Sequence, residues 1–318
     1  MDRPVIVPIL QRIEPISPHS LLRPRFSTKV QTNNWWPNLN FFRAICFGMS
    51  GLFLSACVAD QAVDIESRPI AVNQNAEASG LAGAAGAASV ANTLSATSPT
   101  YVTLTVATQN TGIYAASSGN ESTTPITSGS GFVVSSDGYV VTAAHVAVTK
   151  GNEISARAAN GRIYTGVVSA IFPSNDMALI KLRSFAGRAV VPASAACSST
   201  GSLVYTLGKP HGEGDTARIG NLQSMHFGRT VSYGTFGYPD AMVLHMGTQR
   251  GESGGPVFNG SGQLIGMVVS TLSNASGKSI NTAHAIPSNA IGKFICVAGS
   301  SACTPPWQAL AAKPVDGC

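Results

Sequence analysis

A histidine, an aspartate and a serine stand in three separate segments of this chain, in the order His145, Asp176 and Ser253. A serine hydroxyl is a poor nucleophile at neutral pH unless an adjacent base takes its proton, and that base must itself be oriented by a carboxylate. We therefore assign Ser253 as the nucleophile, His145 as general base and then general acid, and Asp176 as the group that orients His145. Such a set attacks the carbonyl carbon of a peptide or an ester.

Glycines surround the candidate nucleophile in the segment Gly251-Glu252-Ser253-Gly254-Gly255. Attack on a carbonyl creates an oxyanion, which preorganised N–H donors must stabilise. A glycine ahead of the serine lets the backbone turn sharply enough to direct such donors, so we assign the N–H groups of Gly251 and Ser253 to this role. Gly254 and Gly255 are expected to leave room for substrate to pass close to the backbone.

Short β-rich runs dominate the part of the chain that must position these groups. Tyr101–Ala107 alternates with period two, and Asp137-Gly138 between two apolar runs indicates a tight hairpin. His145 directly follows one predicted strand and Asp176 opens another, so rigid elements hold both. Further runs of this kind, separated by Gly, Asn, Ser and Pro, cover residues 163–168, 177–182, 202–207, 241–246 and 263–270.

Regularly spaced short strands are typical of an all-β barrel or sandwich. Residues 101–298 are long enough for two small barrels, with the three candidate groups in the cleft between them. Residues 287–297 are expected to form a closing helix, and the tail 299–318 is expected to be irregular. Residues 58–100 are rich in Ala, Ser, Asn and Gly, which predicts a flexible tether. A short helix is the alternative there, but the glycines disfavour it.

Composition and charge exclude several classes of partner. The chain has 318 residues and a net charge of +5, with 44% hydrophobic and 11% charged residues. Residues 1–56 hold six of the 20 basic and two of the 15 acidic side chains, so the rest is nearly neutral. A near-neutral body offers no surface that follows phosphates, and we expect no nucleic-acid partner. The spacing of His211, His226, His245 and His284 does not fit metal ligation, and no metal or cofactor is expected.

The first 57 residues are typical of an export leader. Arg43 precedes an uncharged, mostly apolar run, residues 44–56, which has the length of a signal-peptide core and is short for a membrane span. The run ends in Leu-Ser-Ala-Cys57, which resembles the lipobox of bacterial lipoproteins. Lipidation of Cys57 and attachment to a membrane are therefore expected; the alternative is an ordinary signal peptide or a buried helix, in which Cys57 is incidental. The 43 residues before the apolar core are more than a signal peptide needs, so either translation starts further along or a long basic region stays in the cytosol.

Four cysteines follow the leader: Cys197, Cys296, Cys303 and Cys318. In an oxidising compartment they can form up to two disulfides, in three possible pairings. Cys296 and Cys303 are close enough to close a small loop, and this is the pair that we favour. Free buried thiols are the alternative.

The segments that carry the three candidate groups resemble, in order and spacing, the protease domain of the HtrA/Deg family of chymotrypsin-like serine peptidases. The resemblance implies two six-stranded antiparallel β-barrels with the active site between them. It also implies a serine endopeptidase of the bacterial cell envelope that forms an acyl-enzyme and cleaves proteins or peptides. The resemblance covers about residues 120–295, and its motifs lie at 130–146, 175–182, 207–212, 249–258 and 284–288.

The chain departs from this family at two points. Glu252 stands where the family usually has Asn, so its carboxylate either perturbs the oxyanion loop or anchors it through a salt bridge. Arg250 is expected either to position that loop or to be solvated. Only some 20 residues follow the protease region, so no PDZ domain is expected.

The resemblance also implies which residues line the primary substrate pocket. None of them is acidic, so a preference for Lys or Arg is not expected, and the strand 265–270 lacks the histidine of glutamate-specific relatives. A small or medium apolar residue before the scissile bond is the predicted preference. The implied pocket residues are Gly247, Thr248, Val269, Ser270 and Thr271.

Two other functions compete with this interpretation. One is a catalytically silent, chymotrypsin-like binding module, against which the intact set of three groups argues. The other is a structural envelope lipoprotein whose β-domain only docks partners. Labelling by a serine-directed fluorophosphonate distinguishes them from an enzyme, because only an activated Ser253 reacts.

Overall fold

A computed structural model describes residues 5–8, 11–12, 71–73, 84–107, 126–210, 214–273, 279–299 and 301–318. The chain divides into two units, and every described residue lies in the unit made of residues 1–14 and 65–318. The predicted signal-peptide core and Cys57 lie outside the described residues. Within the described part, no helix combines the length and the apolar character that crossing a membrane requires.

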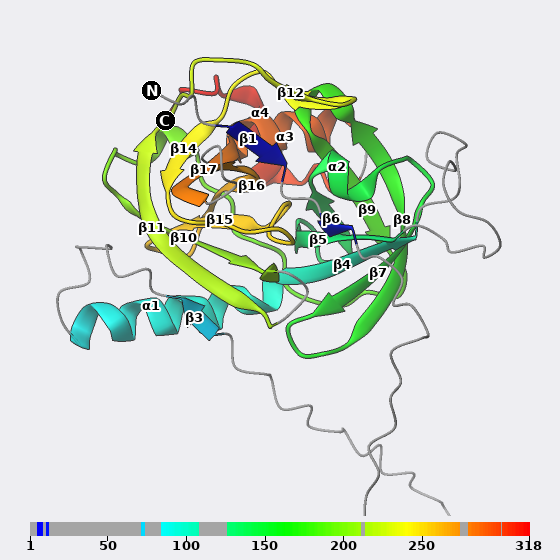
Figure 1. Cartoon of the computed structure of the whole chain (residues 1–318). Helices are drawn as coiled ribbons and strands as arrows, with labels where there is room; N and C mark the ends of the chain where they lie inside the picture. Colours follow the sequence, from blue (N-terminus) through cyan, green and yellow to red (C-terminus); the bar gives the residue numbers. More distant parts are fainter. Residues whose placement is uncertain are drawn as a thin grey trace, which may run out of the picture. The chain divides into compact units, whose positions relative to one another are not determined.

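The first barrel is a closed, antiparallel sheet of six strands (Figure 1, cyan and green). The strands pair in the order β5-β4-β7-β8-β9-β6, and pairing of β5 with β6 closes the ring. Burial alternates along β7 and the first half of β8, since successive residues of a strand point to opposite faces, whereas β9 is buried along most of its length. The strands are β4 (Tyr101–Ala107), β5 (Ile126–Val133), β6 (Tyr139–Thr142), β7 (Glu153–Ala158), β8 (Ile163–Phe172) and β9 (Met177–Leu182).

The second barrel has the same strand number and also closes on itself. Its strands pair in the order β16-β15-β10-β11-β14-β17, and pairing of β16 with β17 closes the ring. Together the two rings confirm the predicted fold of two six-stranded antiparallel barrels. The strands are β10 (Leu203–Gly208), β11 (Thr216–Ser224), β14 (Met242–His245), β15 (Pro256–Asn259), β16 (Leu264–Ser273) and β17 (Ser279–Pro287).

A separate hairpin lies between β11 and β14. Its strands, β12 (Val231–Tyr233) and β13 (Phe236–Tyr238), pair only with each other among the described strands. The hairpin brings aromatic rings to the first barrel, because Tyr233 and Phe236 both make edge contacts with the ring of His145.

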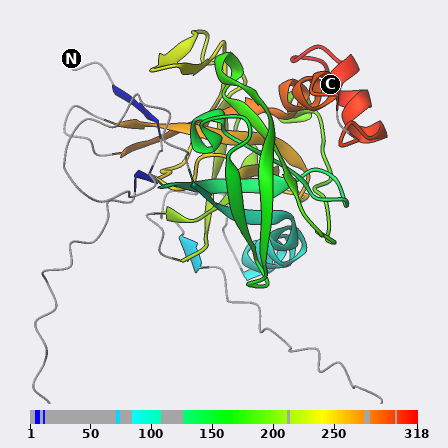
Figure 2. The same ribbon diagram turned by 90° about the vertical axis from the view of Figure 1, so that its right-hand side faces the viewer.

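Three short strands from early in the chain add to the edges of the barrels. β1 (Val5–Pro8) pairs antiparallel with β16, and β2 (Gln11–Arg12) pairs antiparallel with β5. β3 (Ala71–Asn73) pairs in parallel with β11. Figures 1 and 2 show β1 and β2, in dark blue, against these two edges. The two barrels close without β1 and β2, which are therefore additions to complete rings.

Two helices form where the sequence predicted irregular structure. α1 (Ala84–Thr97) lies in the predicted tether, and α4 (Pro305–Ala312) lies in the predicted irregular tail. Six alanines favour α1, and tertiary packing offsets the cost of Gly86: Leu94 is buried, and the hydroxyl of Thr97 contacts that of Tyr205 on β10 at 3.3 Å. In α4, Pro305 and Pro306 occupy the first turn, where the missing N–H costs nothing.

The predicted closing helix is present as α3 (Ser288–Val297), and it packs beside α4 in Figures 1 and 2. Gly292 allows this approach, because a Cβ there would lie 3.1 Å from the Trp307 carbonyl oxygen. Short 3₁₀ turns complete the described elements: η2 (Ser98–Thr100), η3 (Pro173–Asn175) and η4 (Ala195–Cys197).

Two disulfides and a buried indole fasten the C-terminal segment. Cys296 pairs with Cys303, as the sequence favoured, and Cys197 pairs with Cys318. The indole Nε1 of Trp307 donates to the carbonyl oxygen of Val134 at 3.0 Å. These links hold the end of the chain against both barrels, because Val134 follows β5 and Cys197 precedes β10.

Candidate active site

His145 and Asp176 form a hydrogen-bonded pair in the first barrel. His145 lies in the single-turn helix α2 (Ala144–Ala147), which follows β6 directly, and its Nδ1 is 2.8 Å from Oδ2 of Asp176. The backbone N–H of His145 also donates to Oδ1 of Asp176, at 3.0 Å. A carboxylate in this position holds the imidazole in the tautomer that leaves Nε2 unprotonated and able to act as a base.

Asp176 reaches His145 because of an unusual backbone conformation. It ends the turn η3 with φ of 47°, in the left-handed region that Asp tolerates better than most residues. β9 begins at the next residue, so the carboxylate is fixed to a barrel strand, and its side chain is fully buried. Local strain of this kind persists where the surrounding structure over-determines it.

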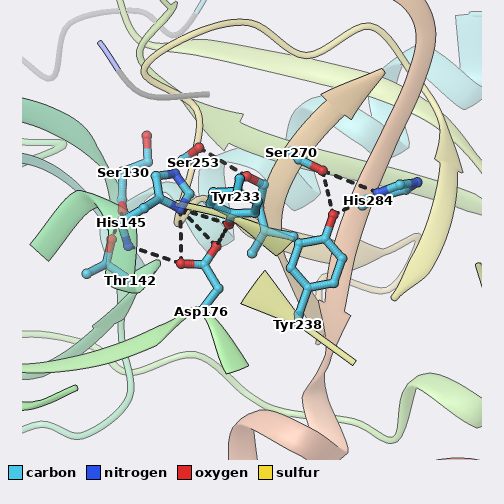
Figure 3. A network of polar contacts seen from close by, with 10 residues as sticks. Ser130, Thr142, His145, Asp176, Tyr233, Tyr238, Ser253, Ser270 and His284 are labelled. Atoms are coloured by element: carbon cyan, nitrogen blue, oxygen red, sulfur yellow. Dashed lines mark hydrogen bonds and ion pairs between the residues drawn. The ribbon is translucent and has the colours of Figure 1, made fainter. Parts of the chain in front are cut away.

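Ser253 lies between the two barrels. Its carbonyl oxygen accepts a hydrogen bond from the N–H of Ser130 on β5 at 2.8 Å, and its hydroxyl donates to the carbonyl of Val269 on β16 at 3.4 Å. Figure 3 draws the His145 ring between Asp176 and Ser253. Among the described residues, Nε2 of His145 has no hydrogen-bond partner. Catalytic hydrogen bonds are often long before substrate binds, so the lack of one in this structure does not exclude Nε2 as the base.

A tight turn precedes the nucleophile. The N–H of Glu252 donates to the carbonyl of Gln249 at 3.2 Å, and Gly251, the third residue of the turn, has φ of 95°. This positive φ is what a type II turn requires at that position, and it explains the glycine. The hydroxyl of Ser130 donates to the Gly251 carbonyl at 2.8 Å, which fixes that carbonyl toward β5. The turn thus has one defined orientation next to Ser253.

The side chain of Glu252 anchors this turn through a buried salt bridge. Both carboxylate oxygens accept from Nε of Arg218 on β11, at 2.6 and 2.8 Å, and one of them also accepts from the N–H of Gln249. Burial raises the pKa of the Glu252 carboxyl, and the Arg218 guanidinium opposes that rise. Of the two expectations for Glu252, the structure has the anchor. Gly208 makes room for it, since a Cβ there would lie 2.7 Å from Cγ of Glu252.

The glycines after Ser253 serve a different purpose from the expected one. A Cβ on Gly254 would lie 2.2 Å from the Ser130 carbonyl oxygen, and one on Gly255 would lie 2.5 Å from the carbonyl oxygen of Leu207. The chain's own strands therefore fill the space that we had expected to receive substrate. These glycines let β5 and β10 pack against the nucleophile loop.

Tyr233 completes the site, and sequence reasoning missed it. Its hydroxyl donates to Oδ2 of Asp176 and lies 3.2 Å from Nδ1 of His145 (Figure 3). Burial, followed by the charge of Asp176, raises the pKa of Tyr233, so the phenol stays protonated and acts as a donor. No local motif marks this residue, because it reaches Asp176 from a hairpin 57 positions further along the chain.

The implied pocket residues lie on two neighbouring segments. Gly247 and Thr248 follow β14, and the others belong to β16. Ser270 turns its hydroxyl toward Tyr238, at 2.7 Å, and is fully buried, so its side chain is not available to substrate. Thr248 is also fully buried, and its hydroxyl has no partner among the described residues. The remaining pocket assignments, including Val269 and Thr271, stay predictions.

The other described histidines have structural partners or lie at the surface. Nδ1 of His284 is 2.8 Å from the hydroxyl of Tyr238, and Nδ1 of His226 is 2.7 Å from Asp240. His245 is exposed, and His211 lies outside the described residues. In the described part of the chain, no group of three His, Cys, Asp or Glu side chains is arranged to hold a metal ion.

Comparison with known families identifies the region that holds the site. Residues 129–267 match the family described as "Trypsin-like peptidase domain". The match includes the three candidate groups, the end of β5, the strands β6 to β9, and the second barrel up to the start of β16.

Curated relatives of the same kind match about half of the chain. The "probable periplasmic serine endoprotease DegP-like" of Brucella suis is 34% identical over 165 residues, which are 51% of this chain and 31% of the relative. The mitochondrial serine protease HTRA2 of Bos taurus is 31% identical over 176 residues, 54% of this chain and 36% of the relative. The chain therefore spans about a third of the length of these relatives.

Solved structures agree on the fold. A structure of the HtrA-type protease AlgW with a decapeptide superposes with a TM-score of 0.54 at 22% identity, covering 67% of this chain and 68% of that one. The chain is thus similar in sequence to trypsin-like peptidase domains over residues 129–267 and to HtrA/DegP-type serine proteases, and its two barrels share the fold of an HtrA-type protease.

Proposed function

We propose that this chain, whose two barrels form an HtrA-like trypsin-type protease domain, is an active serine endopeptidase that works through His145, Asp176 and Ser253. One observation carries the proposal: Asp176 binds Nδ1 of His145 at 2.8 Å, which leaves Nε2 as a base beside the loop of Ser253. The similarity to a "periplasmic serine endoprotease" supports protein substrates.

The reaction follows from what each atom can do. Nε2 of His145 takes the Ser253 hydroxyl proton as Oγ bonds to the substrate carbonyl carbon, and the N–H groups of Gly251 and Ser253 stabilise the resulting oxyanion. The imidazolium then gives its proton to the leaving amine as the C–N bond breaks, which leaves an acyl-enzyme. Water, deprotonated by His145, attacks the acyl carbon, and the imidazolium then returns a proton to Oγ of Ser253 as the ester bond breaks. Asp176 orients the imidazole and stabilises the imidazolium.

The substrate preference that we propose is a small or medium apolar residue before the scissile bond. Val269 on β16 contacts the Ser253 hydroxyl through its carbonyl, so this strand borders the reacting bond. The implied pocket contains no acidic side chain to attract Lys or Arg, and the only polar groups are hydroxyls such as that of Thr248.

We further propose that the enzyme works on the periplasmic side of a bacterial cell envelope, held by a lipid on Cys57. The support is the periplasmic name of the Brucella relative and the leader sequence of residues 1–57. In this proposal residues 58–100 connect the lipid to the protease domain 101–298, and α1 is the part of that connection which packs on the second barrel.

Labelling with a fluorophosphonate tests the central claim. The unaltered protein is expected to react at Ser253, and mass spectrometry of the labelled peptide identifies the modified residue. Ser253→Ala is expected to be unlabelled, while Ser261→Ala, at an exposed turn of the same barrel, labels as the parent does. An unlabelled but folded parent protein contradicts the proposal and favours a silent binding module.

A further inference from the structure

The first strands of the chain occupy two edges that flank the candidate nucleophile. In β1, Val7 pairs with Thr271 and Pro8 pairs with Ser270, both on β16. In β2, Gln11 pairs with Ser128 on β5. One segment of chain therefore adds a strand to both barrels, and both pairings are antiparallel.

Ser253 lies between the two places where these strands bind. Its hydroxyl contacts the carbonyl of Val269, the neighbour of the residue paired with Pro8. Its carbonyl binds the N–H of Ser130, two residues beyond the partner of Gln11. Three Cα–Cα steps of about 3.8 Å join Pro8 to Gln11, so at most about 11 Å of chain links the two strands. The two paired strands therefore lie close together, at the edges on either side of Ser253.

We infer that β1 and β2 occupy the two sheet edges beside Ser253 and exclude protein substrates from the active site. Adding a strand to an exposed sheet edge is a general way to bind a peptide, because main-chain hydrogen bonds supply affinity without a fixed sequence. This inference rests on the proposed function and adds a regulator to it, since the occupant belongs to the same chain.

β1 and β2 lie near the start of the chain, ahead of the predicted processing site. Residues 5–12 belong to the leader that is expected to be removed at Cys57. Tethering makes the strand an intramolecular competitor with a high effective concentration, and cutting the tether abolishes that advantage. The unprocessed chain is therefore latent, and loss of the leader activates it.

Hydrogen exchange measures the contact without relying on catalysis. The parent for this test is the full chain carrying Ser253→Ala, which removes any self-cleavage. The variant compared with this parent carries Ile6→Pro and Val7→Pro in addition. Proline donates no backbone hydrogen bond, so the two substitutions disrupt β1. Within residues 270–273 and 127–128, the amides that point to β1 and β2, and not those that bind β17 and β4, are expected to exchange roughly tenfold faster in the double-proline chain than in the parent. Equal exchange in the two chains overturns the inference.

Kinetics of the active full chain complete the test. Ile6→Pro with Val7→Pro is expected to raise kcat/KM for an unstructured protein substrate roughly tenfold or more, and Gln31→Pro with Thr32→Pro, elsewhere in the leader, leaves it unchanged. A synthetic peptide of residues 5–12 is expected to inhibit the double-proline chain competitively. If all chains cleave at one rate, the inference is wrong although the proposed function stands. If none cleaves or reacts with fluorophosphonate, the proposed function itself has failed.

Discussion

At the scale of single residues, the buried carboxylate of Glu252 is the most consequential departure from the expected motif. Its carboxylate and that of Asp176 are both fully buried, and each is held by a different donor set. Removing a charge from water costs several kcal/mol unless a partner compensates, so the Arg218 guanidinium is required once Glu252 is in place. The turn before Ser253 is consequently closed by two hydrogen bonds, one from the N–H of Glu252 to the carbonyl of Gln249 and one from the N–H of Gln249 to the carboxylate of Glu252.

Substitutions in the Arg218–Glu252 salt bridge are expected to change the stability and the activity of the protein to different extents. Arg218→Met or Glu252→Gln alone is expected to lower the free energy of unfolding by about 3–5 kcal/mol, because each leaves an uncompensated buried charge. The double variant Arg218→Met with Glu252→Leu regains most of that stability but offers no acceptor for the Gln249 N–H, and its kcat falls about 10²–10³-fold, as for loss of an oxyanion donor. Denaturant unfolding and fluorophosphonate labelling rates measure the two effects. A double variant with full activity contradicts this role.

Tyr233 acts on the reaction through Asp176 and is a positioning residue. Tyr233→Phe is expected to lower kcat about tenfold with little change in KM, since one charge-assisted hydrogen bond is lost. The loss falls on kcat because Asp176 loses one of the hydrogen bonds that orient it toward His145. Steady-state kinetics checks this, with Tyr139→Phe, on β6 under the Lys181 cation, as the control. An unchanged kcat means that the hydroxyl is only structural.

The sequence was informative about residues that stand in local motifs and silent about the rest. Ser253 and His145 could be assigned because each chemistry needs particular neighbours, such as the glycines of the turn. Arg218 is 34 positions from Glu252, and Tyr233 is 57 positions from Asp176. Such pairs form only when the barrels close, so no periodicity or spacing in the sequence predicts them.

At the scale of elements, strands were easier to foresee than helices. Alternating runs such as Tyr101–Ala107 predict strands because the pleat has period two, and β4 has those bounds. α1 contains glycine and many alanines, and its formation depends on Tyr205 and on the turn at Gly262, where a Cβ would lie 2.9 Å from Cγ2 of Thr93. α4 depends equally on burial of Trp307. Both helices are set by tertiary contacts.

The disulfide between Cys197 and Cys318 closes a loop with a sequence separation of 121 residues. A cross-link over so long a loop restricts the unfolded chain strongly, and Cys197→Ser with Cys318→Ser is expected to cost about 2–5 kcal/mol of unfolding free energy. Cys296→Ser with Cys303→Ser, which opens a loop of separation seven, is the comparison and is expected to cost less. Guanidinium unfolding without reductant measures both. Equal losses contradict the loop-length argument.

At the scale of the whole molecule, contacts between the barrels fix the site. Asp176 and His145 belong to the first barrel, whereas Ser253 and Glu252 belong to the second. The pair Arg157–Asp215, at 2.7 Å, joins β7 to the segment before β11, and Trp307 reaches from the C-terminal helices to Val134. The geometry of the reacting groups thus depends on how well the two barrels stay together, which makes global stability a condition of activity.

Acid is expected to weaken this global stability through His284. Burial lowers the pKa of His284 to about 4 from an ordinary 6.5, aided by the nearby Arg229 cation and opposed by Asp240. Between pH 6.5 and 4, His284 is therefore protonated in the unfolded chain but not in the folded chain. Up to about 3 kcal/mol of unfolding free energy is lost as pH falls through that range. His284→Gln, which does not titrate, is expected to flatten the dependence of unfolding free energy on pH.

The control is His226→Gln, which is expected to change the pH dependence of the unfolding free energy in the opposite direction. The hydrogen bond to Asp240 raises the pKa of His226, so the stability that His226 contributes is present at low pH and is lost as pH rises. A slope between pH 6.5 and 4 that survives His284→Gln unchanged would show that other groups govern acid unfolding.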